Sequence, residues 1–250
     1  HLETFHTIEN VFQAKNELSK FLKTNLCVYN IDNLYVHRSY IEKQTLKISS
    51  SIYVKSDIYA SNISIKNFKT YFKIHTEDET YEAETNLLGK HNVTNTLLAF
   101  ALAIKLDIRA NDLLDCIKQL EFIPHRLELI KTHINILDDS YNCSLASAKE
   151  SIDVLNHFEN RKMIVTPGII EGGKNEYEIN FELGAMCSKS DYLVIVGNHN
   201  RTAIKNGAIA KNPNCEIILA SSLDDARKHF KLLNNGDNLL LLNDLPDDYS

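Results

Sequence analysis

Apolar and polar positions alternate regularly in the second half of the chain, from about Phe122 onward. Short runs rich in Ile, Leu and Val are separated by longer stretches with helical spacing. The runs predict strands at Leu127–Lys131, Ile134–Leu137, Met163–Val165, Tyr192–Val196, Ile217–Leu219 and Asn238–Leu242, and the stretches predict helices near 144–157, 176–187, 201–209 and 223–232. Strands that alternate with helices form βαβ crossovers, so residues 122–250 are predicted to be an α/β domain with a mostly parallel sheet.

The first half, residues 1–121, has a mixed pattern. A helix is predicted to begin after Thr7 as N-cap and to bury an apolar face of Val11, Phe12, Leu18, Phe21 and Leu22. The apolar run Leu26–Asn30 predicts a strand. From Leu46 to Asn86, β-branched and aromatic residues interleave with polar ones, which predicts an antiparallel meander with a solvated face. Its strands are expected around Ile52–Lys55, Ile63–Ile65, Tyr71–His75 and Tyr81–Ala83, and helices follow at Thr96–Leu106 and about 111–120.

Composition limits the classes of protein. The chain has 250 residues, 44% of them hydrophobic and 24% charged, and a net charge of -6, which is typical of a globular protein and offers no basic footprint for nucleic acid. The five cysteines are scattered without a CxxC pair, so we expect reduced thiols and a cytoplasmic location. No apolar run is long enough to span a bilayer. Because the first residue is not Met, we expect a chain cut from a longer one.

Polar side chains gather after the apolar strand Ile134–Leu137. Asp138, Asp139, Ser140 and Asn142 follow it directly and precede a predicted helix. A turn from a buried strand into a helix is where open α/β sheets collect ligands. The alternative is that Asp139, Ser140 or Asn142 simply caps the next helix.

Five stretches resemble the Mur ligase family, whose members build the peptide of bacterial cell-wall precursors. They occur in the family's order along the chain: HLETF with AKNEL (1–5 and 14–18), GKHNVTN (89–95), HRLE with LDDSYN (125–128 and 137–142), TPGIIE (166–171) and NDLPDDY (243–249). The resemblance implies that 1–121 is the C-terminal part of a central ATPase domain with a β-meander, and that 122–250 is a Rossmann-like C-terminal domain. It also implies the substrates UDP-N-acetylmuramoyl-tripeptide and D-alanyl-D-alanine.

The resemblance implies ATP and Mg²⁺ as cofactors. In such ligases ATP activates a carboxylate as an acyl phosphate, which an amine then attacks. His1 matches a magnesium ligand, and Lys15 matches a lysine that becomes carbamylated and so provides the oxygen ligands that magnesium prefers. The alternative for Lys15 is a solvated surface lysine.

The nucleotide contacts that the resemblance implies come from two stretches. His91, Asn92 and Asn95 match the element that contacts adenine. The alternative is that both asparagines cap a core helix. Gly89-Lys90 is no Walker A loop, because the preceding glycine and the following Ser or Thr are missing.

Arg126 with Asp138 or Asp139 matches a pair that reaches ribose and phosphates. A guanidinium suits phosphate through paired hydrogen bonds. The alternative is a strand with solvated charges.

Ser140 and Asn142 are expected to position substrate.

The sequence departs from the family at His6 and His125, where glycine is usual, at Cys143–Leu145, and at Gly172, where leucine is common. The family's P-loop and its magnesium-binding glutamate do not occur in these 250 residues, so the chain alone is predicted not to hydrolyse ATP.

Two other functions remain open. One is a non-catalytic module that binds a nucleotide or a partner. The other is a different ligase of this type, such as one that partners a glutamine amidotransferase, although the four-cysteine zinc element of that branch is absent from the sequence. A monomer without nucleic-acid or membrane partners is expected.

Overall fold

The computed structural model describes residues 2–17, 21, 26–42, 46–170 and 172–243. The chain divides into two compact units. The first unit is Thr7–Glu121, and the second takes in the chain from Phe122 onward together with the first residues up to His6. We describe each unit by itself.

The first unit is built on a five-stranded sheet in the order β1-β2-β3-β4-β5. Its elements are α2 (Ile8–Asn16), β1 (Leu26–Asn30), α3 (Leu34–Glu42), β2 (Leu46–Ser51), β3 (Ile58–Lys66), β4 (Lys69–His75), β5 (Thr80–Thr85), α4 (Lys90–Lys105) and α5 (Ala110–Lys118). Helix α4 buries Val93, Leu97, Phe100 and Ala101, whose spacing puts them on one helix face. This face packs with Ile117 of α5 against sheet residues such as Phe72 and Ile74, so α4 and α5 cover the sheet.

The predicted meander is confirmed for β3, β4 and β5, which pair antiparallel. It is wrong for β2, which pairs parallel with both β1 and β3. The strand predicted at Ile52–Lys55 is a turn, because side chains satisfy its backbone: Asp32 accepts the Ile52 N–H (2.8 Å), and Ser51 Oγ accepts the next two amides. Local hydrogen bonds of this kind compete with pairing in a sheet.

The first predicted helix is partly confirmed. Thr7 is the N-cap of α2, with its side chain accepting the Asn10 N–H at 3.1 Å. The predicted burial of its apolar face is wrong for the described residues, since α2 has no buried residue and Phe21 is 77% exposed. Leu18 and Leu22 lie outside the described residues.

The second unit confirms the predicted α/β class. Besides α1 (Leu2–Phe5), its elements are β6 (Glu128–Lys131), β7 (Asn135–Asp139), α6 (Leu145–Asn156), β8 (Lys162–Thr166), η2 (Gly173–Asn175), α7 (Glu176–Cys187), β9 (Tyr192–Val196), α8 (Arg201–Lys211), β10 (Glu216–Ala220), α9 (Leu223–Arg227), η3 (Phe230–Leu232) and β11 (Asn238–Leu242). The sheet order is β10-β9-β8-β11-β7-β6, and among these described strands only β6 runs antiparallel to its neighbour. The helix predicted over 223–232 is interrupted, forming α9 and then η3.

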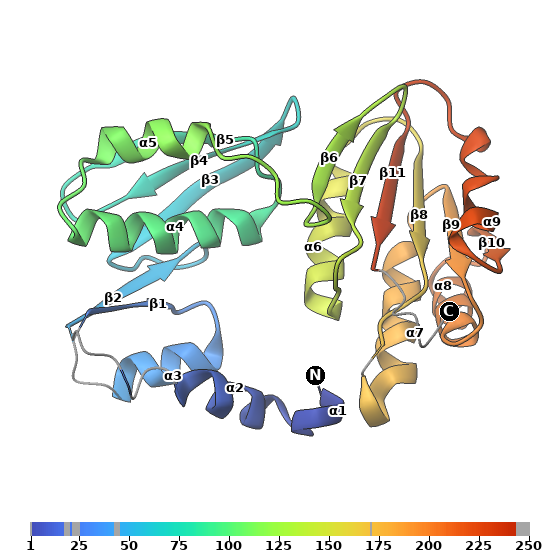
Figure 1. Cartoon of the computed structure of the whole chain (residues 1–250), viewed down its shortest axis with the longest axis horizontal. Helices are drawn as coiled ribbons and strands as arrows, with labels where there is room; N and C mark the ends of the chain where they lie inside the picture. The colour runs from blue at the N-terminus through green and yellow to red at the C-terminus, as the bar shows by residue number, and fades with distance from the viewer. Residues whose placement is uncertain (1, 18–20, 22–25, 43–45, 171, 244–250) are drawn as a thin grey trace. The chain divides into compact units, whose positions relative to one another are not determined.

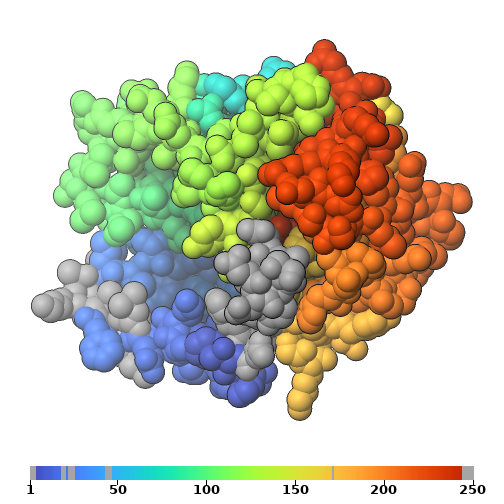
Figure 2. Space-filling view, turned by 45° about the vertical axis from the view of Figure 1, so that its right-hand side comes forward, coloured from blue at the N-terminus to red at the C-terminus, as the bar shows by residue number. Residues whose placement is uncertain are grey.

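Both faces of this sheet are covered. Residues of α9 and the η3 segment pack on the face that carries Met163, Val165 and Val194. Helix α7 packs against both α6 and α8, and α6 and α8 also contact strands of the sheet. The chain from α8 to η3, orange to red, lies together on one side of Figure 2.

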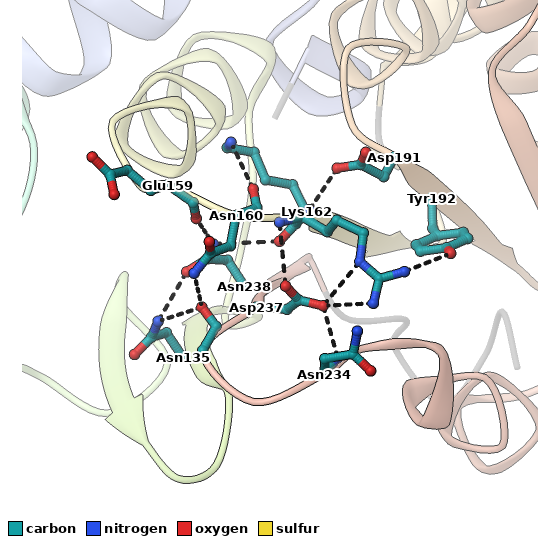
Figure 3. A network of polar contacts seen from close by, with 11 residues as sticks. Asn135, Glu159, Asn160, Lys162, Asp191, Tyr192, Asn234, Asp237 and Asn238 are labelled. Atoms are coloured by element: carbon teal, nitrogen blue, oxygen red, sulfur yellow. Dashed lines mark hydrogen bonds and ion pairs between the residues drawn. The ribbon is translucent and has the colours of Figure 1, made fainter.

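The amino ends of the strands are joined by a polar network (Figure 3). Buried Asp237 accepts hydrogen bonds from the Arg161 guanidinium (3.2 Å) and from the Asn234 backbone (2.7 Å). The Asn135 amide donates to Asn238 Oδ1 (3.0 Å), which links β7 to β11. Since these polar groups satisfy one another, we assign them a structural role.

Candidate functional site

The candidate site lies at the carboxyl edge of the second unit's sheet. Strands β7, β11, β8 and β9 run parallel in neighbouring registers, with Asp139 beside Leu242 and Leu241 beside Val165. Their carboxyl ends therefore meet at one edge, where open α/β sheets bind ligands. The loops after these strands carry the polar residues.

The two aspartates at the end of β7 point to opposite faces of the sheet, because side chains alternate along a strand. Asp139 accepts the Leu127 N–H at 3.1 Å and the hydroxyl of Ser151 on α6. Asp138 accepts the Ser140 N–H at 3.1 Å and lies 2.8 Å from His125 Nδ1. Both residues are buried. The carboxylates therefore have different surroundings, since Asp139 contacts α6 and the Leu127 backbone and Asp138 contacts the His125 side chain.

Arg126 sits in a tightly turned backbone. Its neighbours His125 and Leu127 both have a positive φ, 61° and 52°, a conformation that L residues adopt at a cost. The exposed guanidinium lies over the Tyr141 ring, 4.1 Å from its centroid, and the Tyr141 N–H bonds the His125 carbonyl at 3.2 Å. Such cation–π contact restrains the side chain while leaving its N–H groups available for an anion.

Helix capping does not explain the polar cluster. The N-cap of α6 is Ser144, which forms a capping box with Ser147. Ser140 is half-buried and Asn142 is exposed beside it. The capping alternative for Asp139, Ser140 and Asn142 is therefore wrong.

Cys143 lies between this cluster and α6. Burial raises the pKa of its thiol to about 12, against a smaller opposing effect of its hydrogen bond with Ser147. At neutral pH the thiol is protonated, so it packs as a small apolar group and is no nucleophile.

A buried asparagine clamp, which the sequence analysis missed, holds the loop after β8. The Ile169 N–H donates to Asn180 Oδ1 (2.8 Å), and the Asn180 and Asn200 amides donate to the Ile169 carbonyl (2.7 and 3.1 Å). The Asn243 amide donates to the Gly168 carbonyl at 2.7 Å. A usable signal was Asn180 itself, which occupies the buried face of α7 at helical spacing.

A second pair closes the same edge. His199 Nε2 lies 2.7 Å from Glu176 Oε1, and the other carboxylate oxygen accepts the Gly172 N–H at 3.1 Å. Glu176 thereby links the loops that follow β8 and β9.

The remaining predicted site residues belong to the first unit. Helix α4 begins after Gly89, whose φ of 91° favours glycine. His91 and Asn92 are half-buried and Asn95 is exposed, and all three lie within the helix. The Asn92 amide donates to the Leu88 carbonyl at 2.8 Å, which leaves its carbonyl oxygen as an acceptor. Neither asparagine is the N-cap, so that alternative is wrong.

The two predicted magnesium ligands are not brought together by the described structure. Lys15 is exposed in the last turn of α2, and His1 lies outside the described residues.

Comparison with known proteins now identifies the family. Residues 1–103 match the family model described as the Mur ligase middle domain. A UDP-N-acetylmuramoyl-tripeptide–D-alanyl-D-alanine ligase of Buchnera aphidicola is 33% identical over 180 residues, covering 70% of this chain and 39% of the relative. The chain belongs to the Mur ligase family. The resemblance seen in the sequence motifs is thereby confirmed.

Other Mur ligases agree in sequence and in fold. The Escherichia coli enzyme of the same name as the Buchnera relative is 26% identical over 211 residues, covering 80% of this chain and 46% of its own length. The crystal structure of MurF ligase from Thermotoga maritima in complex with ADP matches with a TM-score of 0.85 and 21% identity, over 97% of this chain and 56% of that one. This Mur ligase chain thus spans less than half the length of these two curated relatives.

The departures from Mur ligase glycines have a common feature. His6 and His125 both keep a positive φ, 63° and 61°, the region that glycine adopts without strain. The backbone is therefore compatible with the family's glycine at both positions.

Among the described helices, none is long and apolar enough to cross a membrane.

Proposed function

We propose that the chain is part of an ATP-dependent, ADP-forming ligase that joins D-alanyl-D-alanine to UDP-N-acetylmuramoyl-tripeptide. The names of the Buchnera and Escherichia coli relatives support the reaction, and the ADP in the Thermotoga structure supports the nucleotide. As part of this proposal, residues 1–121 are the end of the central ATPase domain and residues 122–250 the C-terminal domain. A monomer in the cytoplasm belongs to the same proposal.

The observation that carries the proposal is the exposed Arg126 guanidinium over Tyr141. Its chain neighbours His125 and Leu127 contact the buried carboxylates of Asp138 and Asp139. A guanidinium offers a planar fork of donors to phosphate. A carboxylate such as that of Asp138 accepts hydrogen bonds from ribose hydroxyls. Asp139 binds the backbone of Leu127, next to Arg126, so it is a positioning residue for the arginine.

The donor set on α4 fits adenine. The exposed Asn95 amide and the carbonyl oxygen of Asn92 supply the donor and acceptor that a base edge requires. We assign adenine binding to these two residues and His91, and substrate positioning to Ser140 and Asn142.

Magnesium fits the described residues only with a modification. An ammonium is no metal ligand, so Lys15 would bind the ion after carbamylation, together with His1. When bound, ATP would supply the phosphoryl group that activates the substrate carboxylate, and magnesium would offset the charge of the phosphates. This chain's own residues then orient the nucleotide and stabilise its charge.

The test uses a chimera in which this chain replaces the corresponding segment of the Escherichia coli relative. ADP release by the chimera is measured. We expect release with UDP-N-acetylmuramoyl-tripeptide and D-alanyl-D-alanine together, and little with D-glutamate or a diamino acid as the amine. Arg126→Ala in the same chimera is expected to abolish most turnover without loss of folding. The 250-residue chain alone is the negative control, since a P-loop is needed to hold the β- and γ-phosphates.

Two outcomes would contradict the proposal. A folded chimera that binds ADP but forms none with any amine would support the non-catalytic module. ADP release with D-glutamate and the matching acceptor would assign the chain to another ligase, since curated D-glutamate ligases are also 27% to 29% identical to it.

A further inference from the structure

Three metal-ligating side chains converge at the start of β6. One ligand atom each of His125, Glu128 and Asp138 lies within 4.8 Å of the other two. His125 Nδ1 is 2.8 Å from Asp138 Oδ2, and Glu128 Oε2 accepts the His125 N–H at 3.2 Å. Ser140 Oγ lies 3.5 Å from the same imidazole nitrogen. One nitrogen and two carboxylates therefore face a common point.

The sheet itself forces the two carboxylates together. Glu128 and Asp138 are directly paired in the antiparallel register of β6 and β7, so their side chains lie on the same face. Like charges directly opposite one another destabilise a sheet. In the part of the chain that the structure describes, Asp138 pairs with His125, and neither carboxylate forms an ion pair with a lysine or an arginine. A cation bound between the two carboxylates would offset this repulsion.

Burial sharpens the requirement. The Asp138 side chain is only 9% exposed, whereas that of His125 is 58% exposed. A buried carboxylate costs free energy unless it is paired or coordinates a metal. The Ser140 N–H holds one Asp138 oxygen in place at 3.1 Å, which leaves the other directed at His125. The donor set is thus rigid at Asp138 and open to solvent at His125.

We propose that His125, Glu128 and Asp138 form a binding site for one divalent transition-metal ion of the zinc type. Three protein ligands with a water completing the shell are a common zinc arrangement, with metal–ligand distances of about 2.0–2.2 Å. The imidazole selects transition metals over magnesium. Two carboxylates and a neutral imidazole balance the double positive charge. Closing the ligand atoms around the ion needs a shift of about 1.5 Å from a 4.8 Å separation, which rotation of the Glu128 side chain provides.

The test titrates the untagged 250-residue chain with Zn²⁺ by calorimetry, and with Co²⁺ by absorption spectroscopy. We expect one ion per chain and a cobalt spectrum without a thiolate charge-transfer band. His125→Gly keeps the backbone, because glycine adopts a positive φ freely, and Glu128→Gln keeps the shape. Each should weaken binding by more than the roughly 10- to 100-fold that loss of an outer-shell partner costs.

His199→Ala is the matched control, because it removes a histidine that also contacts a carboxylate, at 2.7 Å from Glu176, but outside this cluster. It should leave the affinity unchanged, and excess Mg²⁺ should not displace Zn²⁺. Three results would overturn the proposal: no saturable binding, equal affinity in wild type and His125→Gly, or a thiolate band showing that cysteines hold the ion. Circular dichroism of each variant confirms that the comparison is between folded proteins.

Discussion

Asp139→Ala should destabilise the second unit, because the Asp139 carboxylate joins three elements of the fold. One oxygen accepts the Leu127 N–H at 3.1 Å, and the other accepts the hydroxyl of Ser151 on α6. Leu127 and Ser151 are each 1% exposed, so water cannot replace the lost acceptor without opening the structure. A buried donor left without a partner costs free energy.

The magnitude follows from the two bonds. The orphaned Leu127 N–H should cost about 1–3 kcal/mol. The Ser151 hydroxyl keeps an alternative acceptor in the Ser147 carbonyl at 3.0 Å, so its loss adds little more than about 1 kcal/mol. We therefore expect a loss of about 2–4 kcal/mol in the free energy of unfolding for Asp139→Ala. Asp139→Asn retains one carbonyl acceptor, and should lose about 1 kcal/mol.

The assay is urea unfolding combined with hydrogen exchange of the Leu127 amide. Exchange reports local opening even where the two units unfold separately. Asp153→Ala is the control, because Asp153 is an exposed aspartate on the same helix, α6, and only its backbone carbonyl bonds His157.

An unfolding free energy within about 0.5 kcal/mol of wild type for Asp139→Ala, the range of neutral surface changes, would refute this reasoning. So would unchanged protection of the Leu127 amide. Either result would mean that the carboxylate serves binding alone.

Three further changes test other parts of the structure. Gly168→Ala should destabilise the fold far more than Gly236→Ala, as thermal unfolding of both variants would show. Both glycines have a positive φ, but a Cβ at 168 would lie 2.5 Å from the Asn180 side chain, whereas the nearest atom to a Cβ at 236 is 3.4 Å away. A maleimide at neutral pH should label the exposed Cys116 and spare Cys143, whose pKa of about 12 leaves almost no thiolate until the pH approaches that value. Peptide mass mapping identifies the labelled cysteines, and rapid labelling of Cys143 in folded protein would contradict the prediction. In an active ligase carrying this chain, Arg126→Ala should lower kcat/KM by roughly ten- to more than a hundredfold, because a contact of about 1.5–3 kcal/mol is lost. Arg126→Lys should restore only part of the lost kcat/KM because the bidentate fork is missing. Normal kinetics in Arg126→Ala would remove the residue from the site.

Local pattern alone determined most strands of the second unit. Tyr192–Val196 and Asn238–Leu242 were predicted with the bounds that β9 and β11 have. Continuous apolar runs between helical stretches identify buried parallel strands, because both faces of such strands are covered. The turn after β7 was located in the same way, and Arg126 and the two aspartates were singled out by motif resemblance.

Sequence patterns failed where distant groups competed with local propensity. Residues 52–55 have the composition of a strand, but the carboxylate of Asp32, twenty residues away from Ile52, accepts the Ile52 N–H, and β2 ends there. The order of strands was equally hidden, since β11, the last in sequence, lies between β7 and β8. No local property of Asn238–Leu242 specifies these neighbours.

The character of the site was decided by tertiary structure. Residue alternation alone separates Asp138 from Asp139, but only the packed sheet shows that one faces Ser151 and the other faces His125. The asparagine clamp on the loop after β8 likewise joins Asn180, Asn200 and Asn243 from three segments. Hydrogen bonds between segments far apart in the chain depend on how the elements pack, and a linear pattern of apolar and polar residues does not encode those distances.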